Sequence, residues 1–144
     1  MQTLRFLTYL AIIGGCLAAD SKKVVQPPGT AQGRPFSAAL EIGDTLYVSG
    51  MTGSGKDGKI SDKFEEEVQQ TLDNISATMK AGGWSLADAV AVQVYLTDMD
   101  LFSRMNAVYM TNFKEPRPTR TTVGIAKLVG TAKIEITVTA RRTT

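Results

Sequence analysis

The pattern of apolar and polar positions first predicts a pair of short strands over residues 36–50. In the second of them, Leu46 and Val48 alternate with more polar positions. This is the two-residue period of a strand that is buried on one face. Gly43 and Asp44 lie between the two candidate strands, and such a pair is typical of a tight turn. We therefore expect a β-hairpin here.

The period then changes to that of an amphipathic helix over residues 62–83. Apolar residues recur every three or four positions, at Phe64, Val68, Leu72, Ile75 and Met79. Asp62, with Glu65 three residues later, predicts the N-terminal cap, and the pair Gly82-Gly83 predicts the end. The acidic run 65–67 falls in the first turn, where it complements the helix dipole, and we expect it to face solvent.

A strand with apolar residues in both phases of alternation follows the helix. Its two rows are Val90, Val92, Val94 and Leu96 on one side and Ala89, Ala91 and Tyr95 on the other. A strand of this kind is covered on both faces of its sheet. A second helical stripe comes next, with Phe102, Met105, Tyr109 and Phe113. After a proline-broken segment, two more strands are expected over 120–128 and 132–140, joined near Gly130.

These elements predict one α+β domain in the order β-β-α-β-α-β-β. An extra short strand near Ile60 would bring the mixed sheet to about six strands. Two helices can cover one face of such a sheet, and the 144 residues suffice for a single core. Since the other face also carries apolar residues, we expect oligomerisation to cover it.

Residues 1–19 have the order of charge, apolar run and small residues that is typical of an export signal. Arg5 precedes an apolar run that is too short to span a membrane comfortably, and Ala18 and Ala19 close it. The tetrapeptide ending at Cys16 resembles a bacterial lipobox. Two routes are therefore open: lipidation at Cys16, or removal of a plain leader after Ala18 or Ala19. Residues 20–34 are rich in Gly, Pro and polar residues and predict a flexible arm.

The composition excludes several classes of protein. The formal net charge is +2, and no stretch concentrates Lys and Arg as a nucleic-acid groove or a membrane-surface patch would require. The chain has no histidine and one cysteine. These counts exclude Ser-His-Asp and Cys-His nucleophile systems, HExxH zinc sites and intrachain disulfides. We expect no metal and no cofactor, so any chemistry must use Arg, Lys, carboxylates, hydroxyls, backbone groups and water.

One stretch has the spacing of a phosphate-binding loop without its other requirements. Residues 50–56 read GMTGSGK, but Asp57 stands where Ser or Thr must ligate magnesium. No helical pattern begins there, and Asp57-Gly58 is typical of a tight turn. We therefore expect an ordinary loop.

Arg120 and Glu135 are the candidate charged groups of a site. Arg120 stands at the start of a predicted strand, where its permanent charge needs water, a carboxylate or a ligand. Glu135 lies between Ile134 and Ile136, so the alternation of the strand turns it away from the isoleucine face. From the residues alone, Glu135 is either an exposed carboxylate, a structural partner of Arg120, or part of a functional site.

The C-terminal stretch PTRTTVGIAKLVGTAKIEI resembles the signature of the RidA/YjgF family, the reactive-intermediate (enamine/imine) deaminases. Three more blocks are similar to that family: RPFSAALEIGDTLYVSG, LDNISATMKAGG and VYLTDMDLFSRMNAVYMTNF. The resemblance covers residues 35–141 without large gaps. It implies a RidA-like domain at 35–142 with a chorismate-mutase-like α+β fold. It also implies a ring-shaped homotrimer with sites between subunits.

The resemblance also implies roles for individual residues. Arg120 would grip the carboxylate of the substrate, and Glu135 would orient or deprotonate a water molecule. Phe36 stands where many deaminating members have Tyr, so the aromatic wall is kept and the phenol is lost. The other positions that match the family's pocket are Ser49, Gly50, Asn106 and Thr122, where Thr122 replaces the Cys of some members.

The implied activity is hydrolysis of 2-imino acids, such as 2-iminopropanoate and 2-iminobutanoate, to 2-oxo acids and ammonia. The alternative is a non-catalytic trimer that binds a small carboxylate in an exported compartment, periplasmic or secreted. RNA cleavage, which is attached to some family members, is disfavoured by the balanced charge, the absence of histidine and the export signal. We expect no nucleic-acid partner, and no membrane contact apart from a lipid anchor at Cys16.

Overall fold

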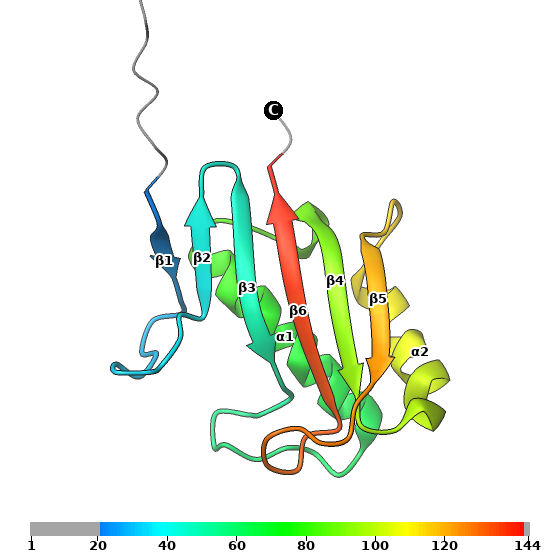
Figure 1. The fold of residues 1–144 in the computed structure, drawn as a ribbon. Coiled ribbons are helices and arrows are strands. Elements are labelled where there is room, and N and C mark those ends of the chain that lie inside the picture. The colour runs from blue at the N-terminus through cyan, green and yellow to red at the C-terminus, as the bar shows by residue number, and fades with distance from the viewer. Residues whose placement is uncertain (1–20, 143–144) are drawn as a thin grey trace, which may run out of the picture.

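The computed structural model describes residues 21–142, so the predicted signal at 1–19 and Cys16 lie outside the described residues. Six strands form one mixed sheet in the order β1-β2-β3-β6-β4-β5 (Figure 1). They are β1 (Lys23–Val25), β2 (Ala39–Ile42), β3 (Thr45–Met51), β4 (Ala89–Leu96), β5 (Thr119–Gly124) and β6 (Ile134–Arg141). Only β4 and β5 pair in parallel among these strands.

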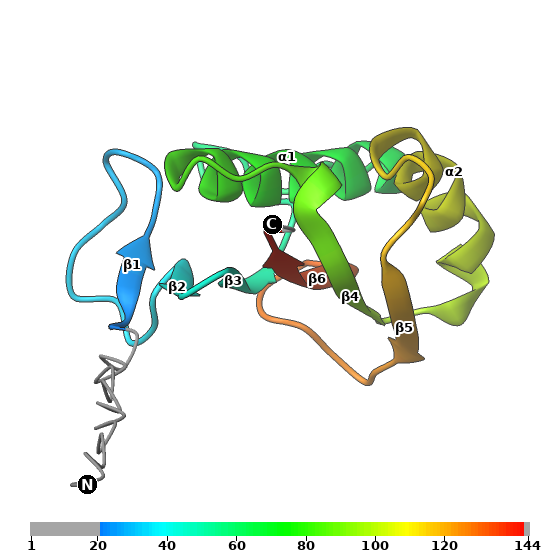
Figure 2. The same cartoon turned by 90° about the horizontal axis from the view of Figure 1, so that it is seen from above.

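Two helices, α1 (Phe64–Ala81) and α2 (Phe102–Asn112), lie on the same face of this sheet (Figure 2). Short 3-10 turns at Leu86–Asp88 and Met99–Leu101 lead into β4 and α2. The predicted α+β class and the two helices on one face are confirmed. Within residues 21–142, no helix combines the length and the apolarity needed to cross a membrane.

The core lies between the helices and the sheet, and the predicted apolar stripes supply it. All five stripe residues of α1 are buried, as are Met105, Tyr109 and Phe113 from the second stripe. From the sheet, β4 contributes Val92, Val94 and Leu96, and β6 contributes Ile134, Ile136 and Val138. The two central strands therefore turn alternate side chains toward the helices.

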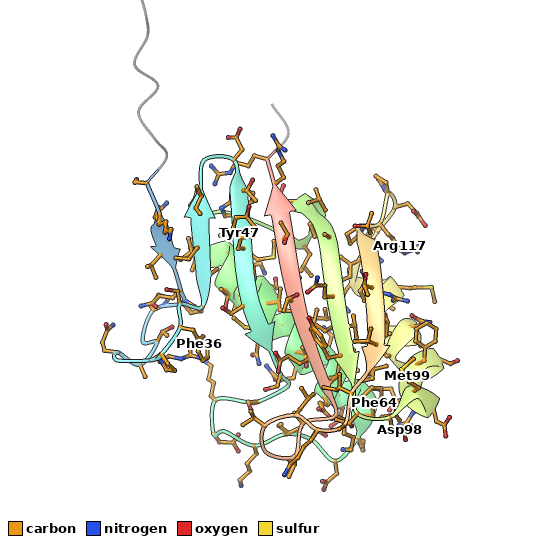
Figure 3. The ribbon with its side chains drawn as sticks, viewed as in Figure 1. Phe36, Tyr47, Phe64, Asp98, Met99 and Arg117 are labelled. Carbon is orange, nitrogen blue, oxygen red and sulfur yellow. The ribbon has the colours of Figure 1, made fainter. Side chains whose placement is uncertain are left out.

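The other face of the sheet carries exposed apolar side chains beside polar ones. Tyr47 on β3, labelled in Figure 3, is 51% exposed. Val123 on β5 is 39% exposed. Gln93, Thr137 and Thr139 alternate with the buried residues of their strands. The expectation of apolar residues on this face is confirmed.

Three details of the predicted strands are wrong. The arm 20–34 contains β1, which pairs with β2 and buries Val25. No strand forms near Ile60, because residues 55–59 close a turn in which the Gly55 amide donates to the Lys59 carbonyl over 2.8 Å. Val90 does not share the buried row of β4, since a bulge in the pairing with β6 leaves it 42% exposed.

The start of α1 also differs from the prediction. Lys63 occupies the N-cap position without a side-chain cap, so Asp62 does not cap the helix. The hydroxyl of Ser61 instead accepts a hydrogen bond from the Lys63 amide over 3.2 Å. The predicted end at Gly82-Gly83 is confirmed, and Gly83 adopts a φ of 75°, which favours glycine.

Glu67 contradicts the expectation that the whole acidic run faces solvent, because its exposed fraction is 0%. Its Oε1 atom accepts hydrogen bonds from the amides of Lys133 at 2.6 Å and Ile134 at 3.3 Å. The Lys133 ammonium lies 3.7 Å from Oε2. This carboxylate therefore fixes the start of β6 against α1, immediately before Glu135.

We predict that Glu67→Ala lowers the free energy of unfolding by about 3 kcal/mol, because two buried amides and the Lys133 ammonium lose their acceptor. Urea unfolding at fixed protein concentration measures this change. The matched control is Glu66→Ala, since Glu66 is one residue away and exposed. Equal shifts of the urea midpoint in the two variants would contradict the assignment.

Candidate functional site

Arg120 lies on the helix-covered face of β5, at the edge of the sheet. Its ladder partner on β4 is Val92, which is buried, and residues opposite each other in a ladder point to the same face. The guanidinium carbon lies 4.6 Å from the ring centroid of Tyr109 and 5.5 Å from that of Phe102. Such contacts hold a cation in place without neutralising its charge. Among residues 21–142, no carboxylate lies within ion-pair distance of Arg120.

Arg120 opens into a cavity of about 370 Å³ between α2 and the start of β5. The cavity is lined by Asn106, Tyr109, Met110, Arg117, Pro118 and Arg120. Arg117 is already paired with Glu115 and also donates to the Phe113 carbonyl over 3.2 Å. Arg120 is therefore the cation that is free to bind an anion here. The cavity offers the positive charge and the side-chain amide that a small carboxylate requires.

Two hydroxyl groups near Arg120, those of Tyr109 and Thr122, are buried and have no hydrogen-bond partner among residues 21–142. Thr122 shares the face of Arg120, because its ladder partner Val94 is buried. Burial raises the pKa of Tyr109, while the positive charges of Arg120 and Arg117 act in the opposite direction. At neutral pH the phenol is therefore protonated and able to donate a hydrogen bond.

Glu135 lies on the opposite face of the sheet, as the sequence predicts. The neighbouring Ile134 and Ile136 are both fully buried under the helices, so Glu135 points away from them. Its carboxylate packs against Gly50 at the end of β3. A Cβ atom at position 50 would lie 2.8 Å from the carboxyl carbon of Glu135, so glycine makes room for this carboxylate.

Ser49 joins Glu135 and Gly50 to the segment that carries Phe36. The Ser49 hydroxyl donates to the Ser37 carbonyl over 2.7 Å, and the Ser49 amide donates to the Ala38 carbonyl over 3.0 Å. Phe36, directly before Ser37, is 52% exposed. The predicted site residues Phe36, Ser49, Gly50 and Glu135 therefore form one group.

The chain thus separates the predicted residues into two groups. The Arg120 group consists of Asn106, Arg120 and Thr122, and the Glu135 group consists of Phe36, Ser49, Gly50 and Glu135. Both Arg120 and Val138 have Val92 as ladder partner, and Glu135 is three residues from Val138. Glu135 therefore lies two strands away from Arg120, about 10 Å across the sheet. It is also displaced by three residues, about 10 Å along the strand direction. Figure 3 shows Phe36 on the side of β1 and β2 and Arg117 on the side of β5, at opposite edges of the sheet.

The possibility that Glu135 is a structural partner of Arg120 within the chain is therefore wrong. The two side chains point to opposite faces, and Glu135 does not line the cavity at Arg120. Within residues 21–142, no group of three or more acidic or cysteine side chains is arranged to hold a metal ion. The candidate site consists of charges, hydroxyls and amides.

Sequence reasoning missed four of the six residues that line the Arg120 cavity, and two of these four, Tyr109 and Arg117, carry polar groups. Tyr109 was expected only as part of the apolar stripe of the second helix. The one feature of the sequence that could have indicated its role is a hydroxyl group in a stripe whose other residues are apolar. Arg117 lies in the proline-broken segment, where no periodic pattern predicts its direction. Tyr109 reaches Arg120 from α2, and Arg117 reaches the cavity from the segment that joins α2 to β5.

Comparison with known proteins agrees with the fold described above. Residues 28–142 match the family model described as Endoribonuclease L-PSP. This chain belongs to the RidA/YjgF family. It is 37% identical over 120 residues to a RutC family protein of Sulfurisphaera tokodaii. The aligned region covers 82% of this chain and 92% of that protein.

Other relatives of this RidA/YjgF chain carry names that refer to deamination or amino-acid binding. A 2-iminobutanoate/2-iminopropanoate deaminase of Dermatophagoides farinae is 31% identical over 118 residues, covering 80% of this chain and 92% of that protein. The crystal structure of E. coli TdcF with bound serine superposes with a TM-score of 0.77 at 29% identity. It covers 85% of this chain and 100% of TdcF.

We predict that Tyr109 titrates above the ordinary tyrosine pKa of about 10, because burial disfavours the phenolate. The absorbance difference near 295 nm between wild type and Tyr109→Phe follows this one hydroxyl as the pH is raised. The pKa of Tyr109 is higher in the folded state than in the unfolded state, so deprotonation favours unfolding. The contribution of the protonated phenol to the free energy of unfolding is therefore complete below about pH 10 and is lost as the pH rises through the folded-state pKa. Titration of Tyr109 below pH 10 would contradict its placement.

Proposed function

We propose that this protein hydrolyses reactive 2-imino acids and their enamine tautomers, at sites formed between the subunits of a homotrimer. The main observation behind this proposal is that Arg120 and Glu135 lie on opposite faces of the sheet within one chain. Each charged group is open on its own side and has no partner of opposite charge among residues 21–142. One substrate can contact both only if a second subunit supplies the missing group.

The edge strand β5 makes such an assembly physically reasonable. Its outer side has no strand partner within residues 21–142, and the face that carries Tyr47 and Val123 is exposed. Open sheet edges and exposed apolar residues are commonly covered by association of subunits. A symmetric ring repeats the same contact, so each interface would bring the Arg120 group of one subunit to the Glu135 group of the next.

In this site the Arg120 group binds and orients the substrate. The guanidinium pairs with the carboxylate of the 2-imino acid in a fork-to-fork manner. The Tyr109 phenol and the Asn106 amide line the same cavity and can donate to that carboxylate. Fixing the carboxylate places the C=N carbon at the mouth of the cavity, where the second subunit contributes its carboxylate.

In the same site the Glu135 group activates water. The carboxylate accepts a proton from a water molecule while the water oxygen bonds to the C=N carbon, and Glu135 returns this proton to the nitrogen, which gives a neutral carbinolamine. Glu135 then carries the hydroxyl proton to the amino nitrogen, the electron pair of the O–H bond forms the C=O bond, and the C–N bond breaks to release ammonia. The products are a 2-oxo acid and ammonia. These steps need no metal, oxidant or reductant. They can therefore be carried out by a chain that has no histidine.

The names of the relatives support the substrate class. One relative is named a 2-iminobutanoate/2-iminopropanoate deaminase, and serine is bound in the TdcF crystal structure. Serine and 2-imino acids share a carboxylate next to the carbon that bears nitrogen. The cavity at Arg120 is suited to this shared group.

A carboxylate-binding trimer without catalysis is the second candidate, because the cavity at Arg120 needs no contribution from Glu135 to hold an anion. Export of either kind of trimer stays a prediction from residues 1–19. The family description names an endoribonuclease, but the balanced charge offers no basic stripe for RNA. The presence of a free carboxylate at Glu135 favours the deaminase.

We predict that Arg120→Ala and Glu135→Gln each lower kcat/KM for 2-iminopropanoate at least about 100-fold. The imine is produced in the cuvette from L-alanine by an amino-acid oxidase, and release of the 2-oxo acid is timed. Glu135→Gln should mainly lower kcat, whereas Arg120→Ala should also raise KM, because only Arg120 binds the carboxylate.

The control for this pair is Arg104→Ala, which removes an exposed guanidinium that pairs with Glu65 on the helix layer. It should retain the wild-type kcat/KM. Wild-type activity in the Arg120→Ala variant would exclude the proposed site. Carboxylate binding by a wild-type protein that accelerates no imine hydrolysis would instead support the binding trimer.

A further inference from the structure

The loop before β2 forms a second cavity, of about 270 Å³, beside the Glu135 group. Its lining includes Gln26, Gln32, Arg34, Phe36 and Ser37. The cavity therefore offers two side-chain amides, a hydroxyl and a guanidinium around one aromatic ring. This is a polar lining with a single sign of charge, which suits an anionic group rather than an alkyl chain.

Arg34 supplies the positive charge of this cavity. Its guanidinium carbon lies 4.6 Å from the centroid of the Phe36 ring, so the ring face holds the cation in place. Among residues 21–142, no carboxylate lies within ion-pair distance of Arg34. The charge is thus positioned but not neutralised, as at Arg120.

The Arg34 cavity is connected to Glu135 through a short chain of contacts. Ser37 lines the cavity, and its carbonyl accepts the hydrogen bond from the Ser49 hydroxyl at 2.7 Å. Gly50, the next residue, packs against the Glu135 carboxylate. The Arg34 cavity and the Glu135 group therefore share the segment of Phe36 and Ser37.

We infer that Arg34 selects 2-imino acids that carry a second carboxylate, such as 2-iminosuccinate, the imine of aspartate. This inference rests on the proposed function of the Glu135 site and names its preferred substrates. The carboxylate next to the C=N carbon binds Arg120 of one subunit, and the distal carboxylate binds Arg34 of the subunit that supplies Glu135. The hydrolysis proceeds by the same steps as for 2-iminopropanoate, and 2-iminosuccinate and water give oxaloacetate and ammonia.

The test compares two imines in four forms of the full protein: wild type, Arg34→Gln, Arg34→Lys and Arg142→Gln. An amino-acid oxidase produces 2-iminopropanoate from L-alanine or 2-iminosuccinate from L-aspartate, and release of the 2-oxo acid gives kcat/KM for each. Arg142→Gln is the matched control, because Arg142 is another guanidinium stacked on an aromatic ring, 4.4 Å from the centroid of Trp84. It lies at the opposite end of β6 from Glu135.

We expect wild type to prefer 2-iminosuccinate and Arg34→Gln to lower the ratio of the two kcat/KM values about tenfold, the effect of losing one charged hydrogen bond. Arg34→Lys should keep most of the ratio, and Arg142→Gln should keep all of it. The rate with 2-iminopropanoate should stay within about twofold in every variant, which shows that the fold and the Glu135 site are intact.

The outcomes separate the inference from the function on which it rests. An Arg34→Gln variant with the wild-type ratio would overturn the role of Arg34 and leave the deaminase intact. A loss of both rates together in that variant would also overturn it, since Arg34 would then support the loop rather than select a substrate. If wild type accelerates neither imine, the proposed function fails, and the selection by Arg34 fails with it.

Discussion

The pairing of β4 with both β5 and β6 is the constraint on which the rest of the structure depends. It fixes Val92 opposite Arg120 on one side and opposite Val138 on the other. Arg120 therefore faces the helices, while Glu135, three residues from Val138, faces the open side of the sheet. No rotation of the side chains can reverse this, because a change of face requires a one-residue slip of a strand whose other residues are buried. The separation of the two charges is a property of the backbone.

Around this constraint, the chain holds its charged groups in two different ways. Glu67 is buried, its Oε1 atom accepts from the amides at the start of β6, and Lys133 lies near its Oε2 atom, so it serves the fold. Arg34 and Arg120 are placed by aromatic rings, which orient a guanidinium but leave its charge available. A guanidinium placed in this second way binds an anion most effectively, since no carboxylate in the described part of the chain competes with the ligand.

The sequence predicted the elements whose patterns are local. The stripe of α1, the turn at Gly43 and the direction of Glu135 all follow from periodicity, and the structure confirms them. The features that it missed depend on distant contacts. β1 has three residues and becomes a strand only by pairing with β2, and Glu67 is buried only because the start of β6 lies over α1. The site residues came from the family resemblance, but their division into two groups needed the register of the sheet.

The most direct measurement of the central claim is complementation between two inactive variants. Arg120→Ala and Glu135→Gln are unfolded together in equal amounts, refolded, and assayed with 2-iminopropanoate. If each site combines Arg120 of one subunit with Glu135 of the next, random assembly restores about one quarter of the sites and a matching share of the activity. Mixed oligomers that stay inactive, although mass spectrometry shows both variants in them, would contradict a site shared between subunits.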